Sequence, residues 1–146
     1  MASSIEYLKE IKSNEMKTQT KLLLIRIAGV VSILFTLFHA GFYWIFKWAE
    51  TLTVMNPTDR GILLTFNLIC ILLLIYSVIL ALGFTHQLIE TVAGKSILLF
   101  FTLFYLVRIV CEFVYFGFQM PSSIFIIAIC LLPALCFALP ALTKSK

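Results

Sequence analysis

Residues 61–84 have the sequence GILLTFNLICILLLIYSVILALGF, which contains no charged side chain. A helix needs roughly 20 apolar residues to cross the hydrocarbon core of a bilayer, and this run is long enough. It is too continuous for a β-barrel strand, because the alternation of period two that marks such strands is absent. The stretch therefore predicts a transmembrane helix.

Three further apolar runs occupy residues 22–46, 96–118 and 123–142. The composition agrees with four spans, since 62% of the residues are hydrophobic and only 12% are charged, about half the charged fraction of a soluble domain. This composition excludes a soluble domain, a nucleic-acid binder and a disulfide-stapled secreted miniprotein. The sequence predicts an all-α integral membrane protein, with residues 1–146 forming a single domain that is an antiparallel bundle of four transmembrane helices.

The polar stretch before the first run predicts a short amphipathic N-terminal helix. Ser3 followed by Glu6 fits a capping box, and one face carries Ile5, Leu8 and Ile11. We interpret this segment as a helix lying on the membrane surface, with a docking segment for a partner as the alternative.

Lysine and arginine are distributed unequally between the two sides of the predicted bundle. An excess of these residues marks the cytoplasmic side of a membrane protein. One side carries Lys9, Lys12, Lys17, Lys21, Arg26, Lys95, Lys144 and Lys146, and the other carries Lys47 and Arg60. We therefore predict that both termini are cytoplasmic, as an even number of spans also allows.

The cysteines offer no disulfide or redox motif. Cys70, Cys111, Cys130 and Cys136 all lie within predicted spans and none forms a C-x-x-C pair. We interpret them as small apolar packing residues.

Four polar residues on three different spans lie at a similar depth in the predicted membrane. His39 is on the first span, Asn67 on the second, and Arg108 and Glu112 on the third. An ionisable residue inside a membrane is by default a candidate for function. We expect these four residues to converge in the outer half of the bundle.

The helical spacing of small and polar residues predicts which faces point inward. The stripe on the third span comprises Tyr105, Arg108, Glu112 and Tyr115. The first span carries Gly29, Ser32, Thr36, His39 and Tyr43, and the second carries Asn67, Cys70, Leu74, Ser77 and Ala81. A seven-residue repeat of this kind favours near-antiparallel packing.

The fourth span contains no ionisable residue. Ala134, Ala138 and Ala141 offer a smooth face, and Pro133 and Pro140 can kink the helix. We interpret it as a packing helix at the edge of the bundle, with a kinked gate as the alternative.

Arg108 and Glu112 are four residues apart and can pair with each other, which would make them a packing device. The alternative is a hydrated cavity that receives an anionic or polar ligand on Arg108. We expect no metal or other cofactor, because only His39, Glu112 and Cys111 lie near one depth and a metal needs three or four convergent donors.

Three classes of function fit the sequence. The first is a non-enzymatic bundle that binds membrane lipid, a hydrophobic ligand or a partner, or that belongs to a larger membrane complex; it is favoured because no convincing nucleophile–base pair is visible. The second is an oligomeric channel or transporter for a small polar or anionic solute, which would require a homo-oligomer. The third is an intramembrane enzyme on a lipidic substrate, with Glu112 or His39 as acid–base and Arg108 as headgroup ligand. Nucleic acid is not an expected partner.

Overall fold

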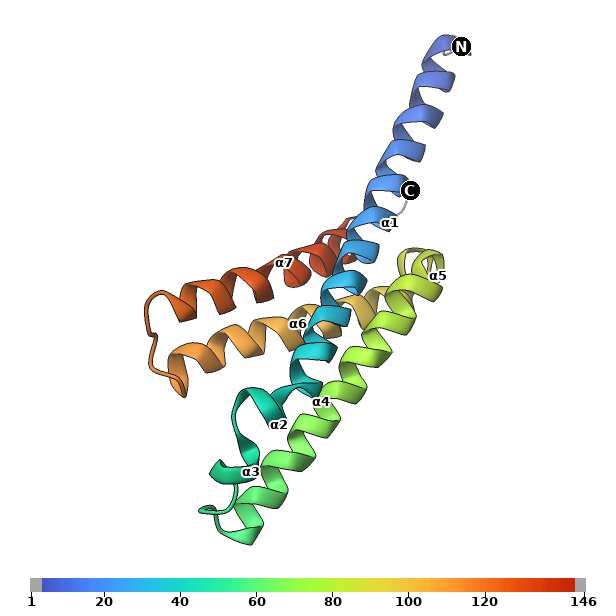
Figure 1. Ribbon diagram of the computed structural model, residues 1–146. Coiled ribbons are helices and arrows are strands. Elements are labelled where there is room, and N and C mark those ends of the chain that lie inside the picture. The colour runs from blue at the N-terminus through green and yellow to red at the C-terminus, as the bar shows by residue number, and fades with distance from the viewer. Residues whose placement is uncertain (1–3, 144–146) are drawn as a thin grey trace.

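The computed structural model describes the backbone of residues 4–143 and the side chains of residues 18–143. The described chain is all-helical, as predicted (Figure 1). Its helices are α1 (Ser4–Ala40), α2 (Phe42–Ile45), α3 (Trp48–Thr51), α4 (Pro57–Gly83), α5 (Thr85–Glu90), α6 (Val92–Val114) and α7 (Ser122–Leu142).

Four helices in the described part of the chain are long and apolar enough to cross a membrane. They are the Thr18–Ala40 part of α1 and the whole of α4, α6 and α7. These four helices pack as a bundle, so the protein is a four-span helical membrane protein.

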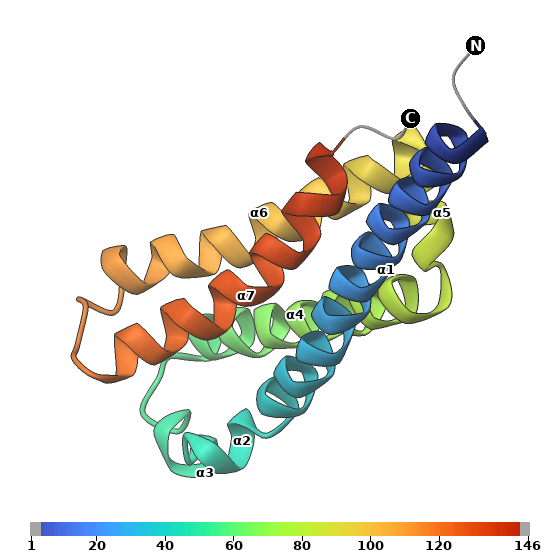
Figure 2. The same cartoon turned by 90° about the horizontal axis from the view of Figure 1, so that it is seen from above.

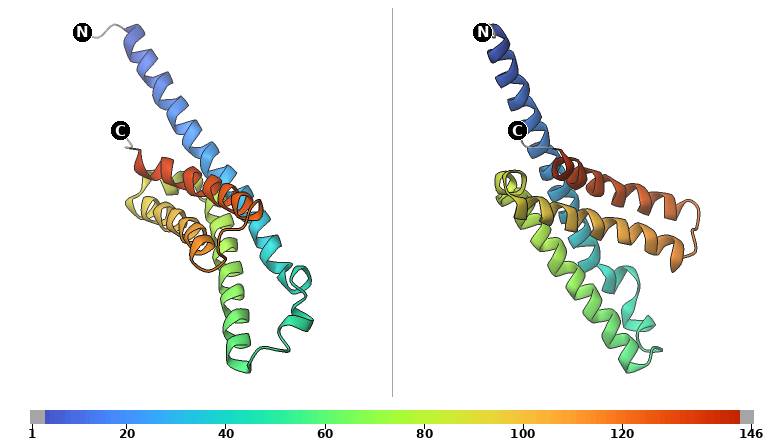
Figure 3. Two further views of the ribbon diagram at one scale, coloured as in Figure 1. Left: turned by 90° about the vertical axis from the view of Figure 1, so that its left-hand side faces the viewer. Right: turned by 180° about the vertical axis from the view of Figure 1, so that it is seen from behind.

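The bundle consists of two antiparallel hairpins, α1 with α4 and α6 with α7 (Figures 1 and 2). Helix α1 also packs against α7 and joins the two hairpins. We call the end with α5 and the C-terminus of α7 the proximal end, and the opposite end the distal end. The hairpins cross steeply, so they meet towards the proximal end and diverge at the distal end (Figure 3).

The start of α4 and both ends of α6 differ from the predicted boundaries because caps and left-handed backbone, rather than apolarity, set them. Helix α4 begins at Pro57 because the Asn56 side chain accepts a hydrogen bond from the Asp59 backbone N–H at 2.9 Å. Helix α6 begins at Val92 because Thr91 Oγ1 accepts from the Gly94 N–H at 2.9 Å. It ends at Val114, before the left-handed backbone of Gly117 and Phe118.

The first span ends at Ala40 rather than at residue 46. Its apolar sequence continues past Ala40, but the chain turns at Gly41 into the short helices α2 and α3. The ring of Phe42 lies against His39, Phe46 and Trp48, at centroid distances of 4.3, 4.8 and 5.8 Å. This aromatic cluster covers the distal end of the first hairpin.

The predicted N-terminal helix is present as backbone but is not a separate element. Helix α1 continues without a break from Ser4 into the first span. The capping residues Ser3 and Glu6 and the expected apolar face lie outside the residues whose side chains are described.

Helix α5 folds back against α6 at a point of close backbone approach. A β-carbon at Gly94 would meet the Gln87 carbonyl oxygen and would lie 2.5 Å from Leu88 Cα. Only glycine fits this position without movement of the backbone.

Helix α7 is not an edge helix, contrary to the prediction. It contacts both α1 and α6. In the apolar stretch of α7, 39% of the residues are buried inside the protein, against 11% in that of α4. Helix α4 is therefore the most exposed of the four to lipid. Small residues such as Ala134 and Cys130 let α7 approach its neighbours closely, and Pro133 and Pro140 are buried with them.

Candidate functional site

Three hydroxyl groups meet at the centre of the bundle where the predicted inward faces come together. Ser32 Oγ lies 3.1 Å from Ser77 Oγ and 2.8 Å from the Tyr105 hydroxyl. Ser32 Oγ also donates to the Ala28 carbonyl oxygen at 2.9 Å. A serine hydroxyl has a single proton, so Ser77 and Tyr105 must donate to Ser32. Ser32 thus links α1, α4 and α6 with its hydrogen-bonding capacity filled.

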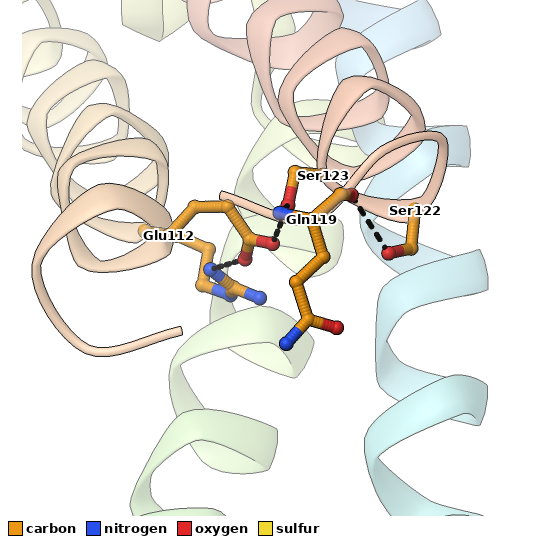
Figure 4. Close-up of polar contacts among 5 residues, drawn as sticks. Glu112, Gln119, Ser122 and Ser123 are labelled. Atoms are coloured by element: carbon orange, nitrogen blue, oxygen red, sulfur yellow. Dashed lines mark hydrogen bonds and ion pairs between the residues drawn. The ribbon is translucent and has the colours of Figure 1, made fainter. Parts of the chain in front are cut away.

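A second polar cluster closes the distal end of the α6–α7 hairpin. Glu112 accepts from Arg108 Nη1 through Oε2 at 2.9 Å and from Ser123 Oγ through Oε1 at 2.7 Å. Ser123 Oγ in turn accepts from the Gln119 backbone N–H at 2.7 Å (Figure 4). The Glu112 side chain is only 5% exposed, and both its oxygens are occupied.

Arg108 is less enclosed than its partner. Its side chain is 33% exposed, and its guanidinium carbon lies 4.8 Å from the centre of the Phe116 ring. Arg108 and Glu112 thus pair along one face of α6, and Ser123 joins Glu112 to the start of α7.

A third polar cluster joins α1 to α4 near the distal end. His39 Nδ1 lies 3.0 Å from Asn67 Oδ1, and Asn67 Nδ2 donates to the His39 carbonyl oxygen at 3.3 Å. The Cys70 thiol lies 3.6 Å from His39 Nε2. Asn67 and Cys70 are three residues apart and therefore share the face of α4 that meets His39.

The hydrogen-bond partners determine which ring nitrogen of His39 carries the proton. The carbonyl oxygen of His39 can only accept, so the Asn67 amide nitrogen faces it and Asn67 Oδ1 faces the ring. His39 Nδ1 must then donate to that oxygen. In the neutral ring Nε2 is left as an acceptor, and the Cys70 thiol donates to it.

This third cluster forms part of the wall of a pocket of about 430 Å³. Apolar side chains make up most of the rest of the wall. The lining comprises His39, Phe42, Trp48, Met55, Asp59, Ile62, Leu63, Phe66, Asn67 and Cys70. The volume falls within the range of small-molecule sites, and a mostly apolar wall with a few convergent polar groups is their usual chemistry.

The four residues expected to converge form two clusters, not one. Arg108 bonds Glu112, and His39 bonds Asn67; among the described side chains no hydrogen bond or ion pair joins the two pairs. The pairs lie on different hairpins, and the hairpins diverge at the distal end, so similar depth does not bring them into contact.

The two tyrosines of the third-span stripe have different surroundings. Tyr105 is 2% exposed and belongs to the central hydroxyl cluster. Tyr115 is 78% exposed, because α6 ends at Val114 and the helical spacing no longer applies beyond it.

Two residues of these clusters were not predicted as site residues. Cys70 was interpreted as a packing residue, although it follows Asn67 by three residues and His39 is at a similar depth. The sequence pattern identifies Ser123 only as the first residue of the last predicted span. A serine at the start of a span, on the helix that follows an intramembrane carboxylate across a short connection, is the signal that identifies it.

Within residues 18–143, no group of three or more histidine, cysteine or acidic side chains could hold a metal ion. Every buried side-chain nitrogen and oxygen in that range has a hydrogen-bond partner. Comparison with protein-family models, with curated proteins and with solved structures finds no match to this chain.

Proposed function

We propose that the protein binds a lipidic ligand, one with a polar group and at least one hydrocarbon chain, in the pocket at the distal end of the α1–α4 hairpin. The pocket itself is the observation that carries the proposal. Its mostly apolar wall suits a hydrocarbon chain, and the His39–Asn67–Cys70 cluster suits a headgroup; Asp59 adds a carboxylate elsewhere in the wall.

The hydrogen bonds in the pocket leave capacity for such a headgroup. Asn67 Nδ2 carries two protons, and in the described structure it has one acceptor, the His39 carbonyl oxygen. The second proton can serve an ester or phosphate oxygen of the ligand. Four spans with short connections between them favour this binding role over that of a pore formed by one copy.

Co-purification from the membrane tests the proposal. The full chain is extracted in mild detergent, and bound lipid is identified by native mass spectrometry. We expect Leu63→Trp, which places an indole in the pocket, to lose most of the bound ligand. Leu68→Trp is the matched control, since Leu68 is an exposed residue of the same helix that does not line the pocket.

Equal ligand occupancy in the two tryptophan variants would contradict the proposal. Asn67→Leu gives a second readout, because it keeps the size of the side chain but removes the amide. It should retain less of a ligand with a polar headgroup.

Solute flux through proteoliposomes that the same substitutions abolish would instead favour the transporter alternative.

A further inference from the structure

We infer that Cys70, His39 and Asn67 form a catalytic triad for acyl transfer, in which Cys70 takes an acyl chain from a lipidic ester or thioester bound in the pocket. The inference rests on the proposed binding function and adds a reaction to it. It follows from the order of the contacts: thiol to His39 Nε2, and His39 Nδ1 to Asn67 Oδ1.

A cysteine nucleophile needs a base within reach of its proton, and the base needs a third group to orient it. His39 Nε2 is 3.6 Å from Cys70 Sγ and is the ring nitrogen left free to accept. Asn67 Oδ1, at 3.0 Å from Nδ1, holds the ring in that tautomer. A nucleophile, an imidazole and an orienting group in this order support acyl transfer on unrelated folds, and one known variant is thiol, imidazole and amide.

The position of the triad also fits a lipidic acyl donor. All three residues line the pocket, so an acyl carbonyl bound there has access to the sulfur. His39 is further held by stacking on Phe42, with ring centroids 4.3 Å apart.

The reaction balances without an oxidant or other co-reactant. Cys70 Sγ attacks the acyl carbon while its proton passes to His39 Nε2. The bond from the acyl carbon to the donor oxygen or sulfur then breaks, and the proton on Nε2 passes to the leaving group. The products are a thioester on Cys70 and the free alcohol or thiol of the donor.

The other cysteines lack this arrangement in the described structure. Cys111 is also half-buried, but it has no histidine partner there, and Cys130 and Cys136 are buried in the helix core. Cys111 therefore serves as the matched control for reactivity that depends only on access.

The purified full chain is reconstituted with one of two alkyne-tagged donors. One arm uses phosphatidylcholine vesicles with tagged acyl chains, and the other uses a tagged long-chain acyl-coenzyme A. Labelled protein is detected by fluorophore attachment, tested for release by hydroxylamine, and mapped by peptide mass spectrometry. Whichever donor labels the protein identifies the source of the acyl chain.

We expect a hydroxylamine-sensitive label on Cys70, unchanged in Cys111→Ser and absent in Cys70→Ala. His39→Gln should slow labelling roughly 100-fold or more, the usual contribution of a general base. Asn67 is a positioning residue, so Asn67→Leu should slow labelling, and Asn67→Asp, which keeps an oxygen for Nδ1, should restore part of it.

Absence of label on Cys70 with both donors would overturn the inference, as would equal rates in the wild type and His39→Gln, or equal label on Cys111. The proposed binding function is judged separately, by lipid that co-purifies with the wild type and is lost in Leu63→Trp but kept in Leu68→Trp. Lipid bound by the wild type without acylation of Cys70 would reject the reaction alone.

Discussion

Glu112 is a buried carboxylate whose negative charge is stabilised by hydrogen bonds from two neighbours. Ser123 and Arg108 each donate to one of its oxygens, at 2.7 and 2.9 Å. Removing one partner of a buried ion pair leaves the other charge uncompensated, which costs more than removing both together. Arg108 is partly exposed whereas Glu112 is buried, so the loss of Arg108 should harm Glu112 more than the reverse.

The first prediction is that Arg108 and Glu112 are energetically coupled. Arg108→Leu should destabilise the protein by about 3 kcal/mol, at the lower end of the range for broken buried pairs. Arg108→Leu combined with Glu112→Leu should be clearly more stable than the sum of the two single changes. Thermal unfolding in detergent, followed by circular dichroism, measures each variant.

The exposed pair of His86 and Glu90 provides the control, since it has the same four-residue spacing at 3.9 Å, with side chains 60% and 67% exposed. Leucine substitutions there should be additive and small. Additive losses at Arg108 and Glu112 as well would show that the carboxylate does not depend on its arginine.

The residue-scale pairing was partly predictable from sequence. Spacing alone placed Arg108 beside Glu112, because residues four apart on a helix are neighbours. The partners Ser123 and Cys70 were missed, since each depends on which residue faces it from another helix. Helical spacing does not supply that information.

At the scale of the elements, Gly94 allows α5 and α6 to touch backbone to backbone. A side chain there would displace Leu88, whose carbonyl oxygen would lie 2.7 Å from the new β-carbon. The clash is with main-chain atoms, which cannot move aside as a flexible side chain would.

The second prediction is therefore that Gly94→Ala destabilises the protein by about 2 kcal/mol, within the usual cost of overpacking. Gly61→Ala is the matched control, because a β-carbon there meets nothing within 4 Å. In a helix, that substitution should be neutral or stabilising by up to about 1 kcal/mol. Equal melting temperatures for the two variants would mean that the backbones of α5 and α6 leave room for a methyl group at Gly94.

The boundaries of the elements could be predicted only approximately from apolarity. The last span begins within one residue of the prediction, at Ser122. At this point the polar connection ends and the apolar sequence begins, and the helix begins there too. The first span was predicted six residues too long, since the apolar segment after Ala40 forms a covering turn instead of more helix.

For the whole molecule, the sequence predicted the number of spans and their antiparallel order but not the angle between the hairpins. Periodicity identifies the inward face of each helix, and Ser32, Ser77 and Tyr105 do meet as those faces require. It does not determine how one hairpin crosses another. The separation of His39 from Glu112 follows from that crossing.

The third prediction concerns orientation in the membrane. The excess of lysine and arginine at the proximal side predicts that this side faces the cytoplasm. In a background with Cys70→Ser and Cys111→Ser, cysteines placed at Ser4 or Ser145 should resist an impermeant thiol reagent in intact cells, and one at Thr53 should react. Permeabilised cells should label at all three positions.

Labelling of Ser4 and Ser145 substitutions from outside intact cells, with protection at Thr53, would reverse the orientation and place the pocket at the cytoplasmic leaflet. That result would also favour acyl-coenzyme A over phospholipid as the acyl donor.

The division of polar contacts between the hairpins has a consequence for biosynthesis. His39 and Asn67 are 28 residues apart and belong to the first hairpin, whereas the Ser32–Tyr105 contact spans 73 residues and needs both. At roughly 5–20 residues per second, a ribosome takes roughly 2–8 s to proceed from Asn67 to Tyr105. The first hairpin can close around its polar residues during that interval, so the pocket can be assembled before the second hairpin enters the membrane.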